Sequence, residues 1–486
     1  MTSQFAQAIF DKLFVPDGKR FVVALNREKL LFTQEVCAKL EGTFAVQIHY
    51  GDALDLRFVR EHYIGEGQDG YVLFIMNREF ELMDDIAEDV DFVNFQFRSF
   101  FPHYPWDVVK TLSFKQQEWL YEQKQYVDLD TLQTENLLRD GTSEIGRKEE
   151  AFRHLQQEWA SICMQIDFNR PTGWMQRTAE ILLSAIEMDR WADFSKDVAW
   201  VNEQFLEFLQ SSYVNIVSST CGSKYPRIVT QVLPFISKQA DEKSALVVVD
   251  GMNYWQALLL TRSLEEHLSI RAKYDCIYAW IPSVTELSRQ AIFRGDIPVV
   301  DYDQSPASEG KLWKEFWSEK GVPSFQQYYQ HSGNISEEMS VNRLGYVVVD
   351  LDEKMHASDN YMYLYDATKR WVAEEEIVGN IRHLIDGGYK VYITTDHGNI
   401  ETTAYRNLDS RDKIGASRSL RHITLPKEAD KAIFEAQYEG HLVQVDSASK
   451  TYYAKEKEAF TSKERCVTHG GAHWLEVLIP FITIEK

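Results

Sequence analysis

The chain has 486 residues, which is long enough for two or three domains with a sizeable core. Its 44% hydrophobic and 26% charged residues are ordinary for a globular protein in water. The formal net charge of -22 disfavours non-specific nucleic-acid binding over the whole surface, although it leaves room for a local basic groove. The five cysteines form no CxxC pair, which argues against a zinc ribbon and favours reduced thiols.

The first segment, MTSQFAQAIFDKLF, carries polar and acidic residues where a signal peptide would be apolar. No apolar run approaches the roughly 20 residues that a membrane-spanning helix needs. We therefore expect a cytoplasmic protein without membrane association.

Residues 1–110 alternate short apolar segments, rich in β-branched and aromatic residues, with helical segments. The predicted strands are 20–26, 44–50 and 70–76, and the predicted helices are 27–40, 55–63 and 78–90. This alternation predicts a small α/β domain with a parallel sheet. A receiver-like regulatory domain is a weaker interpretation, because we find no acidic cluster with a phosphorylatable aspartate and a partner lysine.

Residues 111–238 predict helices instead of strands. Apolar residues recur at helical spacing, with charges on the opposite face, in 149–166, 174–188 and 201–217. We expect a helical middle domain that serves as a spacer or docks a partner.

Residues 239–486 return to an α/β pattern with five strand segments separated by helical ones: 245–252, 276–283, 345–352, 390–398 and 475–485. Strands that are apolar nearly throughout indicate a mainly parallel sheet between helices. Segment 441–456 predicts antiparallel strands within a connection. Ligands bind beyond the carboxyl ends of the strands in such sheets.

Acidic residues and a histidine stand at three of these strand ends. Asp250 precedes Gly251, which alone is typical of an ordinary strand-to-helix turn. Asp352 ends another strand segment, and Asp396 and His397 follow a third in the sequence TTDHGNIE. The adjacent acid and histidine are the more specific signal, because both are metal-ligand types.

Three further residues complete the candidate set. Thr285 follows a proline and begins a helical segment, where a threonine is often only a helix N-terminal residue. His356 lies four residues after Asp352, so both side chains share one side if this turn is helical. His469 precedes two glycines, which permit close backbone approach to a ligand or unusual backbone angles.

Together these residues favour a site for two divalent metal ions. Carboxylate and imidazole ligands suit zinc or manganese and need no thiolate. Two ions about 3.5–4 Å apart could clamp a phosphoryl group. A threonine hydroxyl beside a metal ion loses its proton easily and becomes a nucleophile.

The ordered segments VVVDGMN, PSVTELSRQAIFRG, DLDEKMH, TTDHGNIE and HGGAHWLEVLIP resemble the PglZ domain. That domain belongs to the alkaline phosphatase superfamily, which includes nucleotide pyrophosphatases/phosphodiesterases and cofactor-independent phosphoglycerate mutase. The resemblance covers residues 240–486 and implies an alkaline phosphatase-like catalytic domain. The upstream α/β region and helices are also similar to the layout of phage-defence proteins of the BREX type.

The resemblance implies two metal ions, zinc first and manganese as the alternative. Their ligands would be Asp250, Thr285, Asp396 and His397 for one ion, and Asp352, His356 and His469 for the other. Thr285 would attack phosphorus in line and form a phosphothreonine that water then hydrolyses.

Three residues are expected to contact the substrate. Asn253 lies next to the Asp250 motif, and Arg418 and Arg421 belong to the basic segment 405–431. Either arginine could donate two hydrogen bonds to a phosphate. A solvated loop is the alternative interpretation of that segment.

Two positions have competitors. Asp350 competes with Asp352, but only Asp352 has the family's spacing to His356. His473 competes with His469, but only His469 precedes the glycine pair. A sulfatase is not expected, because Thr285 lacks the Cys/Ser-x-Pro-x-Arg context of those enzymes. A phosphoglycerate mutase is not expected either, because the mutases use a serine nucleophile and carry a large inserted domain, and neither is evident here.

The expected function is therefore a metal-dependent phosphodiesterase or phosphatase in a bacterial anti-phage defence or signalling system. A phosphodiester, such as one within a nucleotide or oligonucleotide, is the expected substrate, and other defence-system proteins are the candidate partners. A homodimer is compatible with the sequence, which leaves the oligomeric state open. The alternative is a non-catalytic or regulatory interaction subunit of a BREX-type complex.

Overall fold

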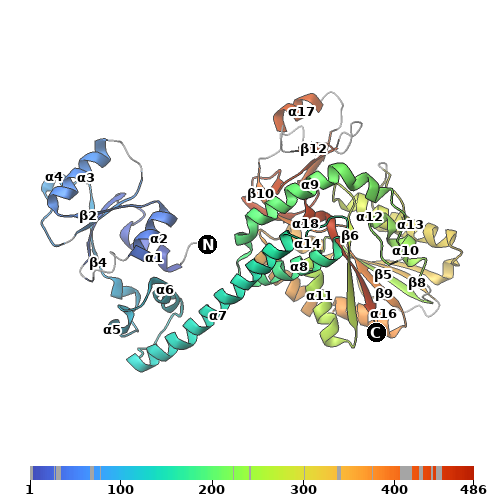
Figure 1. Ribbon diagram of the computed structural model, residues 1–486, viewed down its shortest axis with the longest axis horizontal. Coiled ribbons are helices and arrows are strands. Elements are labelled where there is room, and N and C mark those ends of the chain that lie inside the picture. Colours follow the sequence, from blue (N-terminus) through green and yellow to red (C-terminus); the bar gives the residue numbers. More distant parts are fainter. Residues whose placement is uncertain are drawn as a thin grey trace. The chain divides into compact units, whose positions relative to one another are not determined.

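The computed structural model describes residues 4–26, 28, 34–65, 70–76, 78–222, 224–239, 242–299, 302–335, 341–374, 376–405, 419–425, 431–438, 442–444 and 451–485. The chain divides into two compact units, Met1–Ala151 and Phe152–Lys486. Figure 1 shows the elements of both units.

A four-stranded parallel sheet forms the centre of the first unit, with the strand order β2-β3-β1-β4. Successive residues of β1 enter two different hydrophobic clusters, because neighbouring side chains of a strand face opposite sides of the sheet. The strands are β1 (Phe21–Asn26), β2 (Gln47–Gly51), β3 (Val72–Met76) and β4 (Asp91–Phe95). The helices are α1 (Gln4–Leu13), α2 (Gln34–Phe44), α3 (Ala53–Gly65), α4 (Asp84–Ala87), α5 (Trp106–Val109), α6 (Phe114–Glu122) and α7 (Thr131–Cys163), which runs into the second unit.

The predicted parallel α/β domain is confirmed, with one strand added. Strand β4 was not predicted, because its segment DFVNF is short and contains the polar residues Asp91 and Asn94, and only Phe95 of the five residues is buried. The strand order also differs from the 2-1-3-4-5 order of receiver-type domains. The structure therefore does not support the receiver-like interpretation.

A six-stranded sheet forms the centre of the second unit, with the strand order β6-β16-β9-β5-β8-β7. Neighbouring strands are parallel except at β16, which runs antiparallel to both β6 and β9. The strands are β5 (Ser244–Val249), β6 (Arg271–Tyr278), β7 (Gln327–His331), β8 (Arg343–Val348), β9 (Lys390–Thr394) and β16 (Leu478–Glu485). The predicted mainly parallel sheet is confirmed, and β7 is an additional edge strand.

Helices cover both faces of this sheet (Figure 1). Leu246 and Val248 of β5 face one hydrophobic cluster, whereas Ala245, Val247 and Val249 face another. A sheet buried on both sides explains why its strands are apolar nearly throughout. The helices are α8 (Thr172–Glu187), α9 (Ser195–Val217), α10 (Val232–Ile236), α11 (Tyr254–His267), α12 (Thr285–Arg294), α13 (Pro306–Glu319), α14 (Asp350–His356), α15 (Tyr361–Ala373), α16 (Glu376–Asp386) and α18 (Trp474–Val477).

The helical segment after residue 151 is part of the second unit, which differs from the expected division at 110 and 238. Trp159 of α7, Met175 of α8 and Phe205 of α9 belong to the same hydrophobic cluster as Leu246 of the sheet. The backbone N–H of Cys276 in β6 also donates to the Thr172 hydroxyl at 3.0 Å. These helices cover the sheet, so they need no core of their own.

Residues 405–464, which connect β10 (Ile400–Ala404) to β15 (Arg465–Thr468), form an insertion. Its antiparallel sheet has the order β11-β13-β12, so the antiparallel strands predicted within 441–456 are confirmed. Its elements are β11 (His422–Thr424), α17 (Lys431–Tyr438), β12 (Leu442–Gln444), β13 (Thr451–Ala454) and β14 (Glu458–Ala459).

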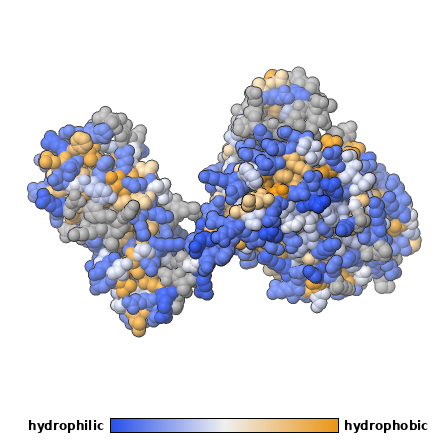
Figure 2. All heavy atoms as spheres, in the orientation of Figure 1, coloured by the Kyte–Doolittle hydropathy of each residue, from blue (hydrophilic) through white to orange (hydrophobic). Residues whose placement is uncertain are grey.

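The surface is mostly polar. Figure 2 shows hydrophilic residues over most of the visible face, interrupted by small hydrophobic patches. Within the part of the chain that the structure describes, no helix combines the length and the apolar character needed to cross a bilayer.

Candidate metal centre

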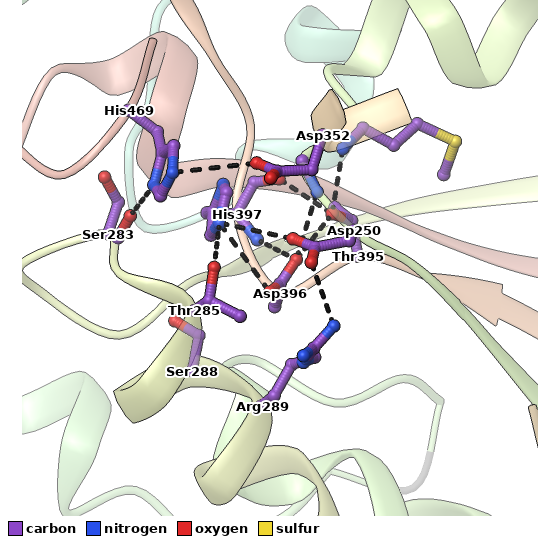
Figure 3. Close-up of polar contacts among 12 residues, drawn as sticks. Asp250, Ser283, Thr285, Ser288, Arg289, Asp352, Thr395, Asp396, His397 and His469 are labelled. Carbon is purple, nitrogen blue, oxygen red and sulfur yellow. Dashed lines mark hydrogen bonds and ion pairs between the residues drawn. The ribbon is translucent and has the colours of Figure 1, made fainter. Parts of the chain in front are cut away.

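The strand-end residues meet at one edge of the central sheet (Figure 3). Asp250 follows β5, Asp396 and His397 follow β9, and Asp352 lies in the first turn of α14 after β8. Because β5 pairs in parallel with both β8 and β9, the three strand ends are neighbours. The structure thus brings these four predicted residues together.

Thr285, the first residue of α12, reaches this edge from another part of the chain. Its Oγ1 lies 3.0 Å from Nε2 of His397. The same Nε2 lies 3.6 Å from Oδ1 of Asp250 and 3.6 Å from Oδ2 of Asp396. On its other side, Nδ1 of His397 lies 2.9 Å from the Gly398 carbonyl oxygen, which can only accept a hydrogen bond. The proton therefore sits on Nδ1, and the lone pair of Nε2 points toward the hydroxyl and the carboxylates.

A second group lies beside the first. Oδ1 of Asp352 is 3.4 Å from Nε2 of His356 and 3.7 Å from Nε2 of His469. Nδ1 of His469 lies 2.8 Å from the Ser283 carbonyl oxygen, so His469 has the same tautomer as His397. The two imidazole rings stack with centroids 3.7 Å apart and planes 8° from parallel. The two groups are therefore adjacent, with Asp352 close to both.

Burial dominates the electrostatics of the site. It raises the pKa of Asp250 well above its ordinary value, the neighbouring Asp396 raises it further, and Arg289 opposes the shift. Burial likewise raises the pKa of Asp396 to about 6 against the opposing charge of Arg289. Burial also acts on Asp352, but its hydrogen bond with His356 and its electrostatic interactions with the surrounding histidines hold its pKa below the ordinary value. Burial and the nearby His397 lower the pKa of His469 well below its ordinary value, which favours the neutral imidazole that metals bind.

The residues fit divalent metal ions. Oδ1 of Asp250 and Oδ2 of Asp396 are buried without a hydrogen-bond partner, which is costly for a carboxylate oxygen. Ligand atoms of Asp250, Asp352 and His397 lie within 4.8 Å of one another, as do those of Asp352, His356 and His469. A divalent cation in the first group would satisfy these two oxygens, and in each group it could also be bound by Nε2 of the histidines. Oxygen and imidazole donors are those expected for zinc or manganese.

Arg289 is a site residue that the sequence analysis missed. Its Nη1 donates to Oδ2 of Asp250 at 2.9 Å, and its Nε lies 2.8 Å from Oε1 of Glu309. Glu309 also accepts from the Tyr329 hydroxyl. Because Arg289 occupies Oδ2, Oδ1 of Asp250 is the oxygen left to face His397. The one available signal was its spacing of four residues from Thr285, which places both on one face of α12.

Asn253 does not face the metal-binding groups, contrary to expectation. Its Nδ2 donates to the carbonyl oxygens of Asn399 at 2.9 Å and Leu475 at 3.2 Å. Its Oδ1 accepts from the backbone N–H of Trp255, which caps the start of α11. Only 1% of its surface is exposed, and its side chain forms hydrogen bonds with backbone groups.

The expected substrate contact by Arg421 also differs from what the structure shows. Arg421 is fully buried, and its Nη2 lies 2.8 Å from Oε1 of Glu476 and 2.6 Å from the Glu456 carbonyl oxygen. Its Nη1 donates to the Glu458 carbonyl oxygen. The guanidinium therefore binds the protein itself. Arg418 lies outside the described residues.

The two competing ligands lie away from the groups. Asp350 is exposed at the start of α14, whereas Asp352 points inward. His473 caps α18, where its Nδ1 accepts from the Leu475 backbone N–H at 3.2 Å. Asp352 and His469 are thus the residues that the fold places in the site.

The family model described as the BREX system PglZ alkaline phosphatase-like domain matches residues 228–484. No curated protein matches the chain. Among solved structures, murine ectonucleotide pyrophosphatase/phosphodiesterase 5 has a TM-score of 0.35 at 11% identity, covering 50% of this chain and 87% of its own. Phosphonoacetate hydrolase from Sinorhizobium meliloti, in complex with phosphonoformate, has a TM-score of 0.34 at 12% identity, covering 50% of this chain and 89% of its own.

Proposed function

The chain belongs to the PglZ family of alkaline phosphatase-like proteins, and we propose that it is a metal-dependent phosphodiesterase with Thr285 as its nucleophile. The observation that carries this proposal is the position of the Thr285 hydroxyl. Its Oγ1 lies 3.0 Å from Nε2 of His397, next to two buried carboxylate oxygens that have no hydrogen-bond partner. A hydroxyl held there is placed to lose its proton and attack.

One metal ion would be held by Asp250, Thr285, Asp396 and His397, and another by Asp352, His356 and His469. When bound, the ions would supply Lewis acidity and offset the negative charge of the reacting phosphoryl group. We propose zinc for both, with manganese as the alternative.

The residues around these ligands orient the side chains that surround the Thr285 hydroxyl. The Gly398 carbonyl fixes the tautomer of His397, and Arg289 fixes the orientation of Asp250. Thr285 is the first residue of a ten-residue helix, whose N-terminal N–H groups and dipole favour negative charge on Oγ1 and on a bound phosphate.

The reaction proceeds in two displacements. Oγ1 of Thr285 bonds to phosphorus, its proton leaves to water, and the ester oxygen departs and takes up a proton. A water molecule then attacks the phosphothreonine, the bond from phosphorus to Oγ1 breaks, and the hydroxyl is restored. Positioning and electrostatics supply most of the rate, as is general for phosphoryl transfer.

The charge around the site supports a phosphodiester over a monoester. A diester carries one negative charge at neutral pH, whereas a monoester carries close to two. The two buried arginines that the structure describes near the site, Arg289 and Arg421, are already paired with carboxylates. The protein therefore offers little positive charge of its own to balance a dianion, which favours the singly charged substrate, such as one within a nucleotide or oligonucleotide.

The family description also supports a role in a phage-defence system with other proteins of that system as partners. We propose a cytoplasmic location. A homodimer is one arrangement to test, by measuring the mass of the protein in solution.

Turnover of bis-p-nitrophenyl phosphate and of p-nitrophenyl phosphate, with added zinc or manganese, tests the activity. We expect the diester to be the better substrate. Thr285→Ala should lower kcat/KM by at least about a thousandfold, since it removes the nucleophile. Thr111→Ala is the matched control, because it removes an exposed hydroxyl in the other unit.

Diester turnover that survives Thr285→Ala would overturn the proposed mechanism. A wild-type chain that hydrolyses neither ester with either metal would favour the alternative, a non-catalytic interaction subunit of a defence complex.

A further inference from the structure

Glu476 is a buried carboxylate at the centre of a hydrogen-bond network behind the second metal-binding group. Its Oε2 accepts from the Ser283 hydroxyl at 2.8 Å and from the Gly471 backbone N–H at 2.8 Å. Its Oε1 accepts from Nη2 of Arg421 at 2.8 Å and from the His473 backbone N–H at 3.3 Å. Four donors occupy both oxygens, so this carboxylate has no remaining capacity to act on a substrate.

Ser283 links this network to His469. Its hydroxyl donates to Glu476 and accepts from the Gly470 backbone N–H at 2.9 Å. Its backbone N–H donates to the Gly471 carbonyl at 3.0 Å, and its own carbonyl accepts from Nδ1 of His469 at 2.8 Å. Every polar group of Ser283 thus holds the loop that carries His469.

The two glycines after His469 allow the insertion to approach this loop closely. Gly470 has a φ of +105°, and a Cβ there would lie 2.3 Å from the Ser419 hydroxyl oxygen. A Cβ on Gly471 would lie 2.5 Å from Nη2 of Arg421. No real side chain tolerates such distances, so the glycines make room for the protein's own insertion.

Arg421 fixes the insertion to this point. Its guanidinium bridges the backbone carbonyls of Glu456 and Glu458 to the carboxylate of Glu476, and all of it is buried. Asn202 of α9 also donates to the Lys455 carbonyl at 3.0 Å. The insertion is thereby held against both α9 and the loop of His469.

We propose that the buried Arg421–Glu476 pair positions His469 for the second metal ion, which makes the insertion bearing Arg421 a part of that site. This inference rests on the proposed two-metal function. Arg421 and Glu476 act as positioning residues, because neither contacts the reacting atoms. Ser283 passes their effect on, since its hydroxyl is bound to Glu476 and its carbonyl sets the tautomer and direction of the His469 ring.

The test is a zinc titration of the metal-stripped full-length chain by competition with a chromophoric chelator. Glu476→Gln replaces one accepting oxygen with a donor, and the double variant Arg421→Met/Glu476→Leu removes both charges so that neither is left buried alone. We expect two binding steps in the wild type. In both variants, the step that depends on His469 should weaken by about 10–100-fold, and the other step should stay unchanged.

Tyr452→Phe is the matched control, because the Tyr452 hydroxyl binds Glu435 within the same insertion, at 2.8 Å. It should bind both ions as the wild type does. Cobalt in place of zinc gives a spectroscopic check, since the visible absorption of the second cobalt ion should change in Glu476→Gln and stay the same in Tyr452→Phe. Where the double variant does not fold, Arg421→Lys, which keeps the charge but loses the fork of donors, should weaken the same step by a smaller factor.

The outcomes separate this inference from the proposed function. A wild type that binds two ions, with variants that bind both equally well, overturns the positioning role alone. A wild type that binds fewer than two ions overturns the two-metal site itself and this inference with it. Equal weakening of both steps would show a general structural effect and would also overturn the specific role.

Discussion

Asp396→Asn should stabilise the metal-free protein and remove most of its stabilisation by zinc. Asp396 is fully buried, and burial raises the pKa of its carboxyl to about 6 in the folded chain. A carboxyl with a raised folded-state pKa favours folding below its unfolded pKa near 4. That contribution is lost as the pH rises through 6. At about pH 8 the ionised Asp396 therefore lowers the free energy of unfolding of the metal-free protein.

The size of this destabilisation follows from the change in the pKa of Asp396. A change in pKa from 3.8 to about 6 corresponds to about 3 kcal/mol. An asparagine keeps the acceptor that binds the backbone N–H groups of Gly251 and His397, so little else is lost. With zinc at about 100 times its dissociation constant, the wild type gains about 2.7 kcal/mol, and the variant, lacking a charged ligand, gains little. The difference in unfolding free energy between Asp396→Asn and the wild type should therefore shrink, or change sign, when zinc is added.

Urea unfolding with a chelator and with zinc, at about pH 5 and about pH 8, measures both effects. Asp275→Asn is the matched control, because burial also raises the pKa of Asp275 to about 6, and this residue of strand β6 belongs to neither metal-binding group. It should gain stability at the higher pH with or without zinc. If Asp396→Asn were less stable than the wild type in the chelator, or gained as much from zinc, the reasoning would be refuted.

Three further predictions concern stability. Arg289→Met should cost about 3–5 kcal/mol in urea unfolding, since it leaves two carboxylates buried without their cation, and a loss under about 1 kcal/mol would contradict the bridging role. Gly471→Ala should cost about 1–3 kcal/mol and lower the thermal midpoint, because its methyl group would overlap the Arg421 guanidinium; an unchanged midpoint would mean that the insertion can move away. Phe205→Ala should cost about 3–5 kcal/mol and lower the unfolding midpoint of the sheet itself, whereas a separate early transition of the helices would argue for an independent middle domain.

The sequence was sufficient for the main sheet and for the position of the strand-end residues. Apolar runs show strands that are buried on both faces, and parallel strands share one carboxyl edge, so Asp250, Asp352 and Asp396 had to be neighbours. The edge strand β7 was harder to see, because QYYQH is polar and mostly half-buried. Thr285 was a candidate because it begins a helical segment after a proline, but its approach to His397 could not be derived from the sequence, since it depends on the path of the chain between two elements.

The residues that hold the ligands could not be found in the same way. Arg289 pairs with Glu309, and Arg421 pairs with Glu476. The partners in each pair are far apart in the sequence, so the hydrophobic periodicity of a helix or strand does not predict these contacts. The basic segment in an acidic chain suggested a phosphate site, but Arg421 is buried and paired with Glu476. Asn253 was predicted as a substrate contact for a related reason, because helix capping and ligand binding use the same polar side chains, and in the structure it caps α11.

Strand β16 has a consequence for how the protein is made. It lies between β6 and β9, although both of these strands precede it in the chain by many residues. While a ribosome is still synthesising the segment before β16, the sheet has a vacant position with two open strand edges, which can pair with other chains. His469 and Glu476 emerge just before that strand. During synthesis the chain therefore completes its sheet and its candidate metal centre almost together, so a chain that stops before β16 lacks both.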